Sequence, residues 1–229
     1  MANFFNSSIG KKFLVSITGL FLIAFLAVHL IINSMILFDN SGELFNRAAH
    51  FMASHPVIRI VEPLLAIGFI LHIIYAVVVT IQNWIARPIG YEKRKSSHSS
   101  TWSSRNMIWL GILVLAFLVI HIAQFFWKMK VTGDPLLEGA VYDGEHMENA
   151  YQLVTTFFIS WWWVVGLYVA GAVALGFHLV HAFWSAFQTL GLSNSKWRKI
   201  LNVIGLVYTL IISAGFAIIP LWVKIASML

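Results

Sequence analysis

Long runs of apolar residues dominate this chain, and the polar positions gather in the stretches between them. Five runs reach or exceed the roughly 20 residues that a helix needs to cross a bilayer. They cover residues 13–38, 57–85, 107–127, 153–187 and 200–228. The second and fourth runs are long enough to tilt in the membrane or to project beyond it. The pattern predicts an all-α protein, a five-helix transmembrane bundle that forms one integral-membrane domain over residues 1–229.

Composition agrees with this prediction and narrows the possible chemistry. Hydrophobic residues make up 59% of the chain and charged residues 10%, with a mean hydropathy of +0.82, as is typical of multi-pass membrane proteins. The absence of cysteine excludes disulfides, cysteine-ligated iron–sulfur clusters and covalently attached c-type haem. Any electron carrier must therefore be held non-covalently. We expect no cleavable signal peptide, because the first run can span a membrane and lacks a clear small-residue cleavage site.

Basic residues are distributed unevenly among the connections between the runs. Ten of the fifteen lie before the first run, between the second and third, or between the fourth and fifth. The positive-inside rule then predicts a cytoplasmic N-terminus and, with five helices, an external C-terminus. The net charge of +6 and the pI near 9.7 are explained by these cytoplasmic loops, so we expect no nucleic-acid partner.

One histidine in each of the first four runs is a candidate ligand: His29, His72, His121 and His178. An ionisable side chain is costly in hydrocarbon, so it faces the bundle interior and by default marks a functional site. Imidazole is also an axial ligand of haem iron, and four histidines match the requirement of two bis-histidine haems. A single such histidine could simply hydrogen-bond a neighbouring helix, but four in depth-matched positions favour haem binding.

Depth along the helices predicts how these histidines pair. His29 and His121 lie ten and seven residues before the outer polar ends of their runs, which is about 10–15 Å at about 1.5 Å per residue. His72 and His178 lie nearer the middle or the inner half. The predicted pairs are therefore His29 with His121 and His72 with His178. His181 is one turn beyond His178 on a nearby face, so spacing alone does not choose between these two.

Other positions carry weaker signals. Ser16 and Thr18, near the inner start of the first run, could hydrogen-bond a haem propionate or, equally, a carbonyl of their own helix. The tryptophans at 161–163 indicate an interfacial aromatic belt. Three glycines of the fourth run could admit a porphyrin edge, although close helix packing is the commoner reason: Gly166, Gly171 and Gly176. The remaining histidines fall in connections that we expect to be wet: His50, His55, His98 and His146.

Several short motifs carry a resemblance to a known family. They are Ser16-x-x-Gly19 leading to His29-Leu30-x-x-Asn33, the run Phe45-Asn46-x-Ala48-Ala49-His50-Phe51-Met52 with Pro56, His72-x-x-Tyr75, His121, and His178 ahead of Phe183-Trp184-Ser185 and Gly191. The chain resembles the single-polypeptide dihaem cytochrome b anchor of bacterial succinate:menaquinone oxidoreductases, the succinate dehydrogenase cytochrome b558 type. The related fumarate reductase anchor is similar in its first helix and haem histidines. The resemblance covers most of the chain, and the run from Phe45 to Met52 is its most specific part.

The resemblance implies partners and a function. A flavoprotein subunit with FAD and an iron–sulfur subunit would bind the cytoplasmic face in the bacterial cytoplasmic membrane, and the dicarboxylate chemistry would take place there. This chain would then hold no catalytic residue. It would carry electrons between the iron–sulfur subunit and menaquinone through two b haems, first the inner and then the outer.

The resemblance also implies which residues hold the haem iron. It selects His178 over His181, and it assigns the pair His29/His121 to the outer haem and the pair His72/His178 to the inner one. Gly176 departs from the pattern, because some fumarate reductase anchors have a glutamate there that is associated with transmembrane proton transfer. That proton route is therefore in doubt.

We expect the quinone near the outer haem, where Asn33, His50 and Glu62 lie close to the His29 end of the bundle. Glu62 either serves this site or pairs with Arg59 at the membrane surface. Two other functions remain open: a cytochrome b subunit of another quinone-linked complex, such as a hydrogenase or formate dehydrogenase, and a haem-free transporter that uses histidines as a proton relay.

Overall fold

The computed structural model describes residues 7–86, 102–192 and 194–229. Five of the described helices are long and apolar enough to cross a membrane, which confirms the predicted number. The spans are built on α1 (Ser8–Ser34), α3 (Pro56–Ile85), α5 (Met107–His121), α7 (Trp162–Thr189) and α8 (Ser195–Ala226), and the third span continues beyond α5 to Thr132. A 3-10 turn, η2 (Met35–Leu37), extends α1, and two π-helical segments, η3 (Ile122–Phe126) and η4 (Lys128–Thr132), extend α5. The short helix α4 (Trp102–Arg105) precedes α5.

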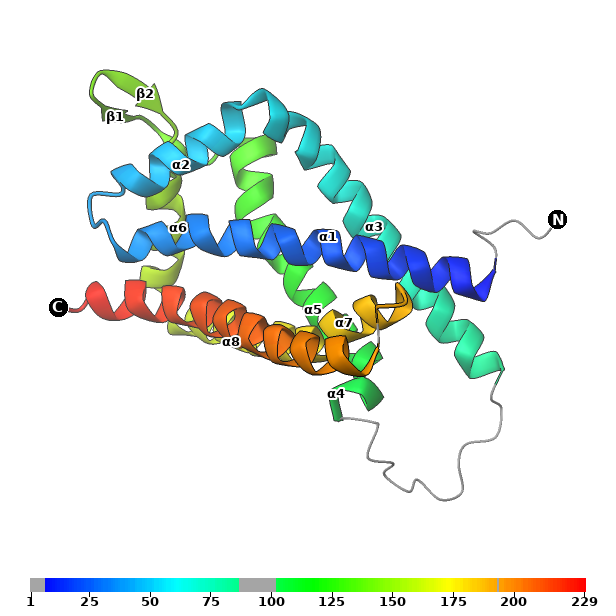
Figure 1. Cartoon of the computed structure of the whole chain (residues 1–229). Helices are drawn as coiled ribbons and strands as arrows, with labels where there is room; N and C mark the ends of the chain where they lie inside the picture. Colours follow the sequence, from blue (N-terminus) through cyan, green and yellow to red (C-terminus); the bar gives the residue numbers. More distant parts are fainter. Residues whose placement is uncertain (1–6, 87–101, 193) are drawn as a thin grey trace.

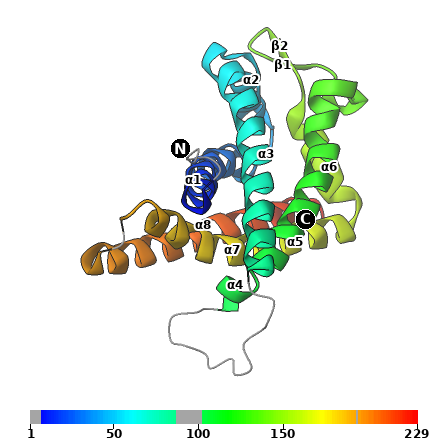
Figure 2. The same ribbon diagram turned by 90° about the vertical axis from the view of Figure 1, so that its right-hand side faces the viewer.

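The spanning helices form a bundle around α7 and α1. The pair α7 and α8 has the most extensive contact, α1 packs against α3, α7 and α8, and α5 packs against α7. Figure 1 shows α3 and α5 inclined to α1, α7 and α8, and Figure 2 views α1 nearly end-on with α3 and α5 upright. The start of α1 and the end of α8 lie at opposite ends of the bundle (Figure 1), as an odd number of spans requires. Which end faces the cytoplasm stays a prediction.

The end of the bundle where α1 finishes also carries several short elements. These are α2 (Glu43–Ser54), η5 (Pro135–Leu137), the strands β1 (Ala140–Tyr142) and β2 (Glu145–Met147), and α6 (Ala150–Ser160). We call this end the hairpin end and the other the N-terminal end. The strands pair antiparallel through a turn at Asp143 and Gly144, both with positive φ, as the Asp-Gly pair of a two-residue hairpin favours. The hairpin is a small β element in an otherwise helical protein.

Asn46 fastens α2 to the distant connection that follows α5. Its side chain is fully buried, and its Nδ2 donates to Tyr142 Oη and to Asn149 Oδ1, each at 3.1 Å. Its Oδ1 accepts the backbone N–H of Tyr151 at 2.8 Å. A buried amide is stable only when its donors and acceptors are paired, so this position is specific for asparagine.

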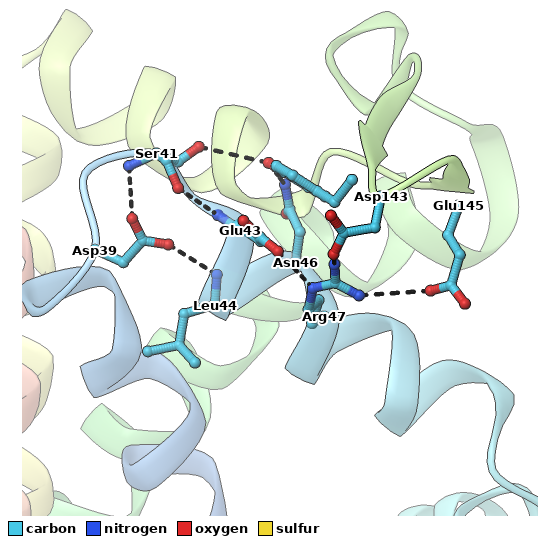
Figure 3. Close-up of polar contacts among 9 residues, drawn as sticks. Asp39, Ser41, Glu43, Leu44, Asn46, Arg47, Asp143 and Glu145 are labelled. Atoms are coloured by element: carbon cyan, nitrogen blue, oxygen red, sulfur yellow. Dashed lines mark hydrogen bonds and ion pairs between the residues drawn. The ribbon is translucent and has the colours of Figure 1, made fainter.

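Arg47, the next residue, faces a cluster of acids at the same end. Its guanidinium forms ion pairs with Glu43 at 2.7 Å, with Asp143 at 2.5 Å and with Glu145 at 3.5 Å. Figure 3 shows that these acids come from α2 and from the hairpin. Because the carboxylates are exposed, each pair is worth little by itself, but the three share one cation. The run from Phe45 to Met52 therefore joins two connections that lie about 100 residues apart in the sequence.

The predicted fourth helix over residues 153–187 is wrong in its first part. The structure has two helices there, α6 and α7, separated by Trp161 in an extended conformation with φ of −142° and ψ of 121°. Lys224 of α8 is buried at this break, where its Nζ donates to the carbonyl of Ile159 and lies 5.4 Å from the ring centroid of Trp162. This contact satisfies a carbonyl that the end of α6 leaves without a helical partner. Neither glycine nor proline stands at the break, so the apolar pattern of the sequence gives no sign that the helix ends there.

Candidate functional site

His29 of α1 and His121 of α5 lie side by side near the hairpin end. Their ring centroids are 5.7 Å apart and their planes are nearly perpendicular, at 89°. Two imidazoles on opposite faces of one metal ion have centroids about 6 Å apart, because each metal–nitrogen bond is about 2 Å long. The separation of these rings suits a shared metal ion. We call this pair the hairpin level.

Aromatic side chains surround the hairpin level. Five rings from four helices lie with their centroids 5.2–6.0 Å from the nearer histidine: Phe25, Phe117, Phe125, Tyr168 and Phe216. Flat apolar surfaces of this kind exclude water and favour a planar apolar ligand.

His72 of α3 lies against the first half of α1, where it contacts Val15, Thr18 and Gly19. Its Nδ1 is 3.2 Å from the carbonyl oxygen of Val15 and 3.3 Å from Oγ1 of Thr18. A Cβ at Gly19 would lie 3.3 Å from Cε1 of His72, tighter than ordinary van der Waals contact. Gly19 therefore allows the imidazole to approach the helix backbone.

His178 of α7 is the fourth predicted ligand. Its Cε1 lies 3.8 Å from the Cβ that Gly111 of α5 would carry. His181 follows His178 one helical turn later on α7. His72 and His178 each stand sixteen residues after the start of their helices. We call the pair of His72 and His178 the N-terminal level.

The two levels are separated along both α1 and α5 by the same interval. Gly19, which contacts His72, stands ten residues before His29, and Gly111, which faces His178, stands ten residues before His121. Ten helical residues rise about 15 Å. The rings of His29 and His121 lie close together, as one of the predicted pairs requires, whereas the pairing of His72 with His178 and metal binding by all four histidines stay predictions.

Two of the histidines have a ring nitrogen without a partner. Nδ1 of His121 and Nδ1 of His178 are buried without a hydrogen-bond partner among the described residues. An unpaired buried polar atom costs about 1–3 kcal/mol, and a metal ion held at Nε2 would leave this cost in place. Among the described residues no three His, Cys, Asp or Glu side chains group together as metal ligands.

The helix after His121 departs from α geometry. The segment Ile122–Phe126 is π-helical, a form that is rare and frequent at functional sites. It carries Gln124, whose Oε1 accepts the hydroxyl proton of Tyr168 at 2.6 Å. Tyr168 is also one of the rings beside His121. Sequence reasoning missed this contact, for which the only signal was a polar residue three positions after a candidate ligand.

The glycines of α7 separate into two kinds. A Cβ at Gly171 would lie 2.5 Å from the ring of Phe117, and one at Gly176 would lie 2.7 Å from Oγ of Ser213. Close packing therefore explains both glycines, and a glutamate at position 176 would have to displace α8. Gly166 has no atom within 4 Å of its Cβ position.

The polar candidates near the first helix bond mainly within it. The hydroxyl of Ser16 donates to the carbonyl of Lys12 at 3.0 Å, and Nδ2 of Asn33 donates to the carbonyl of His29 at 2.8 Å. Thr18 differs, because its hydroxyl bonds its own helix and also contacts the imidazole of His72. The structure therefore makes Thr18, and not Ser16, a direct neighbour of a candidate ligand.

Glu62 and His50 lie at the hairpin end, as the sequence indicates. His50 is exposed on α2. Glu62 lies 3.5 Å from Nζ of Lys130 in η4, whereas the sequence suggested Arg59 as its partner. Arg59 was the expected partner because it stands three residues before Glu62, one turn away on the same helix. The segment η4, which follows α5, places Lys130 beside Glu62 instead. His98 lies outside the described residues.

Two carboxylates at the hairpin end have a lowered pKa. Asp39 accepts the backbone N–H groups of Leu44 and Ser41, each at 2.8 Å, and these bonds lower its pKa. Asp134 accepts from Lys128 at 2.6 Å and from the N–H of Leu136 at 3.0 Å, and its pKa is lowered mainly by the lysine. Both acids stabilise the connections in their ionised form.

Comparison with known proteins adds one relative. Fold and site describe a multi-pass membrane protein with histidines on four of its spanning helices. The chain is similar to the succinate dehydrogenase cytochrome b558 subunit of Bacillus subtilis (strain 168), with 25% identity over 170 residues, which cover 74% of this chain and 73% of that protein. No family model and no solved structure matches the chain.

Proposed function

We propose that this chain is the membrane anchor and electron-transfer subunit of a bacterial succinate dehydrogenase or fumarate reductase. The single observation that carries the proposal is the arrangement of four intramembrane histidines in two levels, one of which holds two imidazoles 5.7 Å apart. The similarity to a succinate dehydrogenase cytochrome b558 subunit supports the same function. The chain is then a multi-pass protein of the bacterial cytoplasmic membrane, and its flavoprotein and iron–sulfur partners bind the cytoplasmic face.

In this proposal the histidines hold two b haems, His29 with His121 and His72 with His178. Haem iron supplies one-electron transfer between the partner subunits and menaquinone. The residues of this chain fix the position of that chemistry: the helices set the separation of the two levels at about 15 Å, and the aromatic rings exclude water from the hairpin level. The dicarboxylate reaction belongs to the partner subunits, so this chain contributes no catalytic residue.

A pyridine haemochrome assay on the purified complex tests the proposal, with flavin measured in the same sample. We expect two b haems per chain and a co-purifying flavoprotein. Replacement of any one of the four ligands by alanine should remove the haem of its own level, and His181→Ala is the matched control that should keep both. A colourless protein, or two unchanged haems in His178→Ala, would contradict the ligand assignment. Nickel or molybdenum in place of flavin would indicate a different quinone-linked complex.

Reporter fusions test the orientation. A reporter after Ser195 should be cytoplasmic and one at Leu229 external, since the positive-inside rule places the N-terminal end in the cytoplasm. A cytoplasmic reporter at Leu229 would reverse the membrane sides assigned to the two levels.

We place the quinone at the hairpin end, beside the ion pair between Glu62 and Lys130, with Asn33 and His50 nearby. An acid inside the first turns of a spanning helix needs a partner or a role in proton transfer, and quinone reduction consumes protons. Glu62→Gln should lose turnover with quinone while both haems and turnover with an artificial flavin-level acceptor are retained. Glu148→Gln, which changes an exposed acid at the same end, is the control. Unchanged quinone turnover in Glu62→Gln would leave Glu62 a surface charge.

A further inference from the structure

The imidazole of His72 differs from those of His121 and His178 in the partners of its Nδ1. The ring is held between α1 and α3 with Nδ1 3.2 Å from the carbonyl of Val15 and 3.3 Å from Oγ1 of Thr18. Nδ1 of His121 and Nδ1 of His178 have no such partner among the described residues. At the N-terminal level, Nδ1 of His72 therefore has hydrogen-bond partners, whereas Nδ1 of His178 has none among the described residues.

The chemistry of the partners decides where the proton of His72 lies. A backbone carbonyl can only accept a hydrogen bond. The single hydroxyl proton of Thr18 is directed to its own helix, since Oγ1 is 2.7 Å from the carbonyl of Leu14 and 3.1 Å from that of Val15. The lone pairs of Oγ1 remain available to accept. Both contacts of His72 Nδ1 are therefore satisfied when Nδ1 carries the proton, which leaves Nε2 as the nitrogen with a free lone pair.

We infer that Thr18 is a positioning residue for His72: with the Val15 carbonyl it accepts the Nδ1 proton, fixes the tautomer that presents Nε2 as a ligand, and raises the donor strength of the imidazole. This inference rests on the proposed function, because it concerns the haem that His72 would hold. Hydrogen bonding at the distal nitrogen of a ligand histidine orients the ring and increases its basicity. A more basic ligand stabilises the oxidised iron, so it lowers the reduction potential.

Close packing makes this role specific for Thr18. Thr18 is buried, and Gly19 next to it lets the imidazole edge approach the helix. Ser16, also buried on α1, has its hydroxyl bonded to the carbonyl of Lys12. Position 18 therefore contributes an acceptor to a ligand, while position 16 serves its own helix.

The test is a redox titration of the two haems in Thr18→Val, which removes the hydroxyl at nearly constant volume. We expect full haem content, an upward shift of the midpoint potential of the His72 haem, and no shift of the haem at the hairpin level. The low-spin EPR signal of the same haem should change with the potential. Thr18→Ser, which restores the acceptor, should return both towards the wild-type values. Thr80→Val is the matched control, because the hydroxyl of Thr80 on α3 donates to the carbonyl of Ala76 in its own helix and to no other described residue.

Each outcome decides the inference. Loss of the His72 haem in Thr18→Val but not in Thr18→Ser supports the positioning role, since serine keeps the hydroxyl that valine lacks. An unchanged potential and EPR signal at full haem content overturns it, as does equal haem loss in both variants. A wild-type protein without haem overturns the proposed function itself. An unchanged midpoint potential of the His72 haem in Thr18→Val overturns only the role of Thr18 and leaves that function intact.

Discussion

The two levels of histidines are built with different kinds of contact. At the hairpin level the imidazoles of His29 and His121 face each other directly and are enclosed by aromatic rings. At the N-terminal level the imidazole of His72 contacts polar atoms of α1, and it can approach that helix closely because Gly19 has no side chain. Apolar rings position a side chain by shape, but a hydrogen bond also selects its tautomer. The difference indicates that hydrogen bonds control the protonation of one candidate ligand, His72, at the N-terminal level.

The largest expected effect comes from filling the space at Gly19. In Gly19→Val the new side chain would meet His72, because the Cβ alone lies 3.3 Å from its Cε1. We expect loss of the haem of the N-terminal level and retention of the other, measured as one haem per chain in place of two. Gly166→Val, at a position with no atom within 4 Å of its Cβ, should keep both. Two haems with unchanged midpoint potentials in Gly19→Val would show that the close contact between His72 and α1 is not needed for haem binding.

A smaller effect is expected when the hairpin end is loosened at Asn46. Asn46→Ala removes hydrogen bonds to Tyr142 and Asn149 and leaves the backbone N–H of Tyr151 without its side-chain acceptor. We expect a loss of about 1–3 kcal/mol in the free energy of unfolding, the cost of unpaired buried polar groups. Thermal unfolding in detergent, followed by haem absorbance, measures it, and the hairpin level should be affected first. Asn202→Ala, on the exposed face of α8, should unfold like the wild type; equal release from both levels in Asn46→Ala would contradict the local effect.

The hydroxyl of Tyr168 offers a finer probe of the hairpin level. Tyr168→Phe removes the bond to Gln124 beside His121, with an expected loss of about 0.5–1.5 kcal/mol in stability. The EPR signal of the hairpin-level haem should shift while that of the N-terminal level does not. Tyr208→Phe removes a comparable hydrogen bond to the carbonyl of Ile23 and should cost similar stability without this shift. A shift at both levels would mean that the levels are not separable.

The smallest effect concerns pH. The folded protein lowers the pKa of Asp39 and of Asp134, so both groups bind protons more weakly when folded than when unfolded. Their stabilisation is present above the unfolded pKa of about 4 and is lost as the pH falls below it. Acid should therefore loosen the hairpin end before the N-terminal level, as measured by hydrogen exchange between pH 5 and pH 3. Asp134→Asn should weaken this dependence; a pH response confined to the N-terminal level would contradict it.

The relation between sequence and structure differs between the spans and the connections. The five spans follow from uninterrupted apolar length, a property that each segment carries by itself, and the structure has all five. The break at Trp161 was missed because it depends on Lys224 of another helix. The partner of Glu62 was missed for the same reason, since Lys130 is distant in the sequence but adjacent at the end of α5.

The candidate site shows the same division. Depth counted along the helices predicts two pairs of histidines, because helical rise converts sequence distance directly into height, and this pairing stays a prediction. The same count does not tell how each helix is rotated about its own axis. This rotation places Thr18 and Gly19 against His72, and Phe117 against Gly171.

The sequence by itself determined the number of spans, the absence of cysteine chemistry and the heights of the four histidines, because apolar length, composition and helical rise are local properties. Only the tertiary structure decided which atoms meet: the nearly perpendicular rings of His29 and His121, the proton acceptors of His72, and the closure of the hairpin end by Asn46. These contacts depend on how helices far apart in the chain rotate and pack against one another, and such packing is a property of the whole bundle.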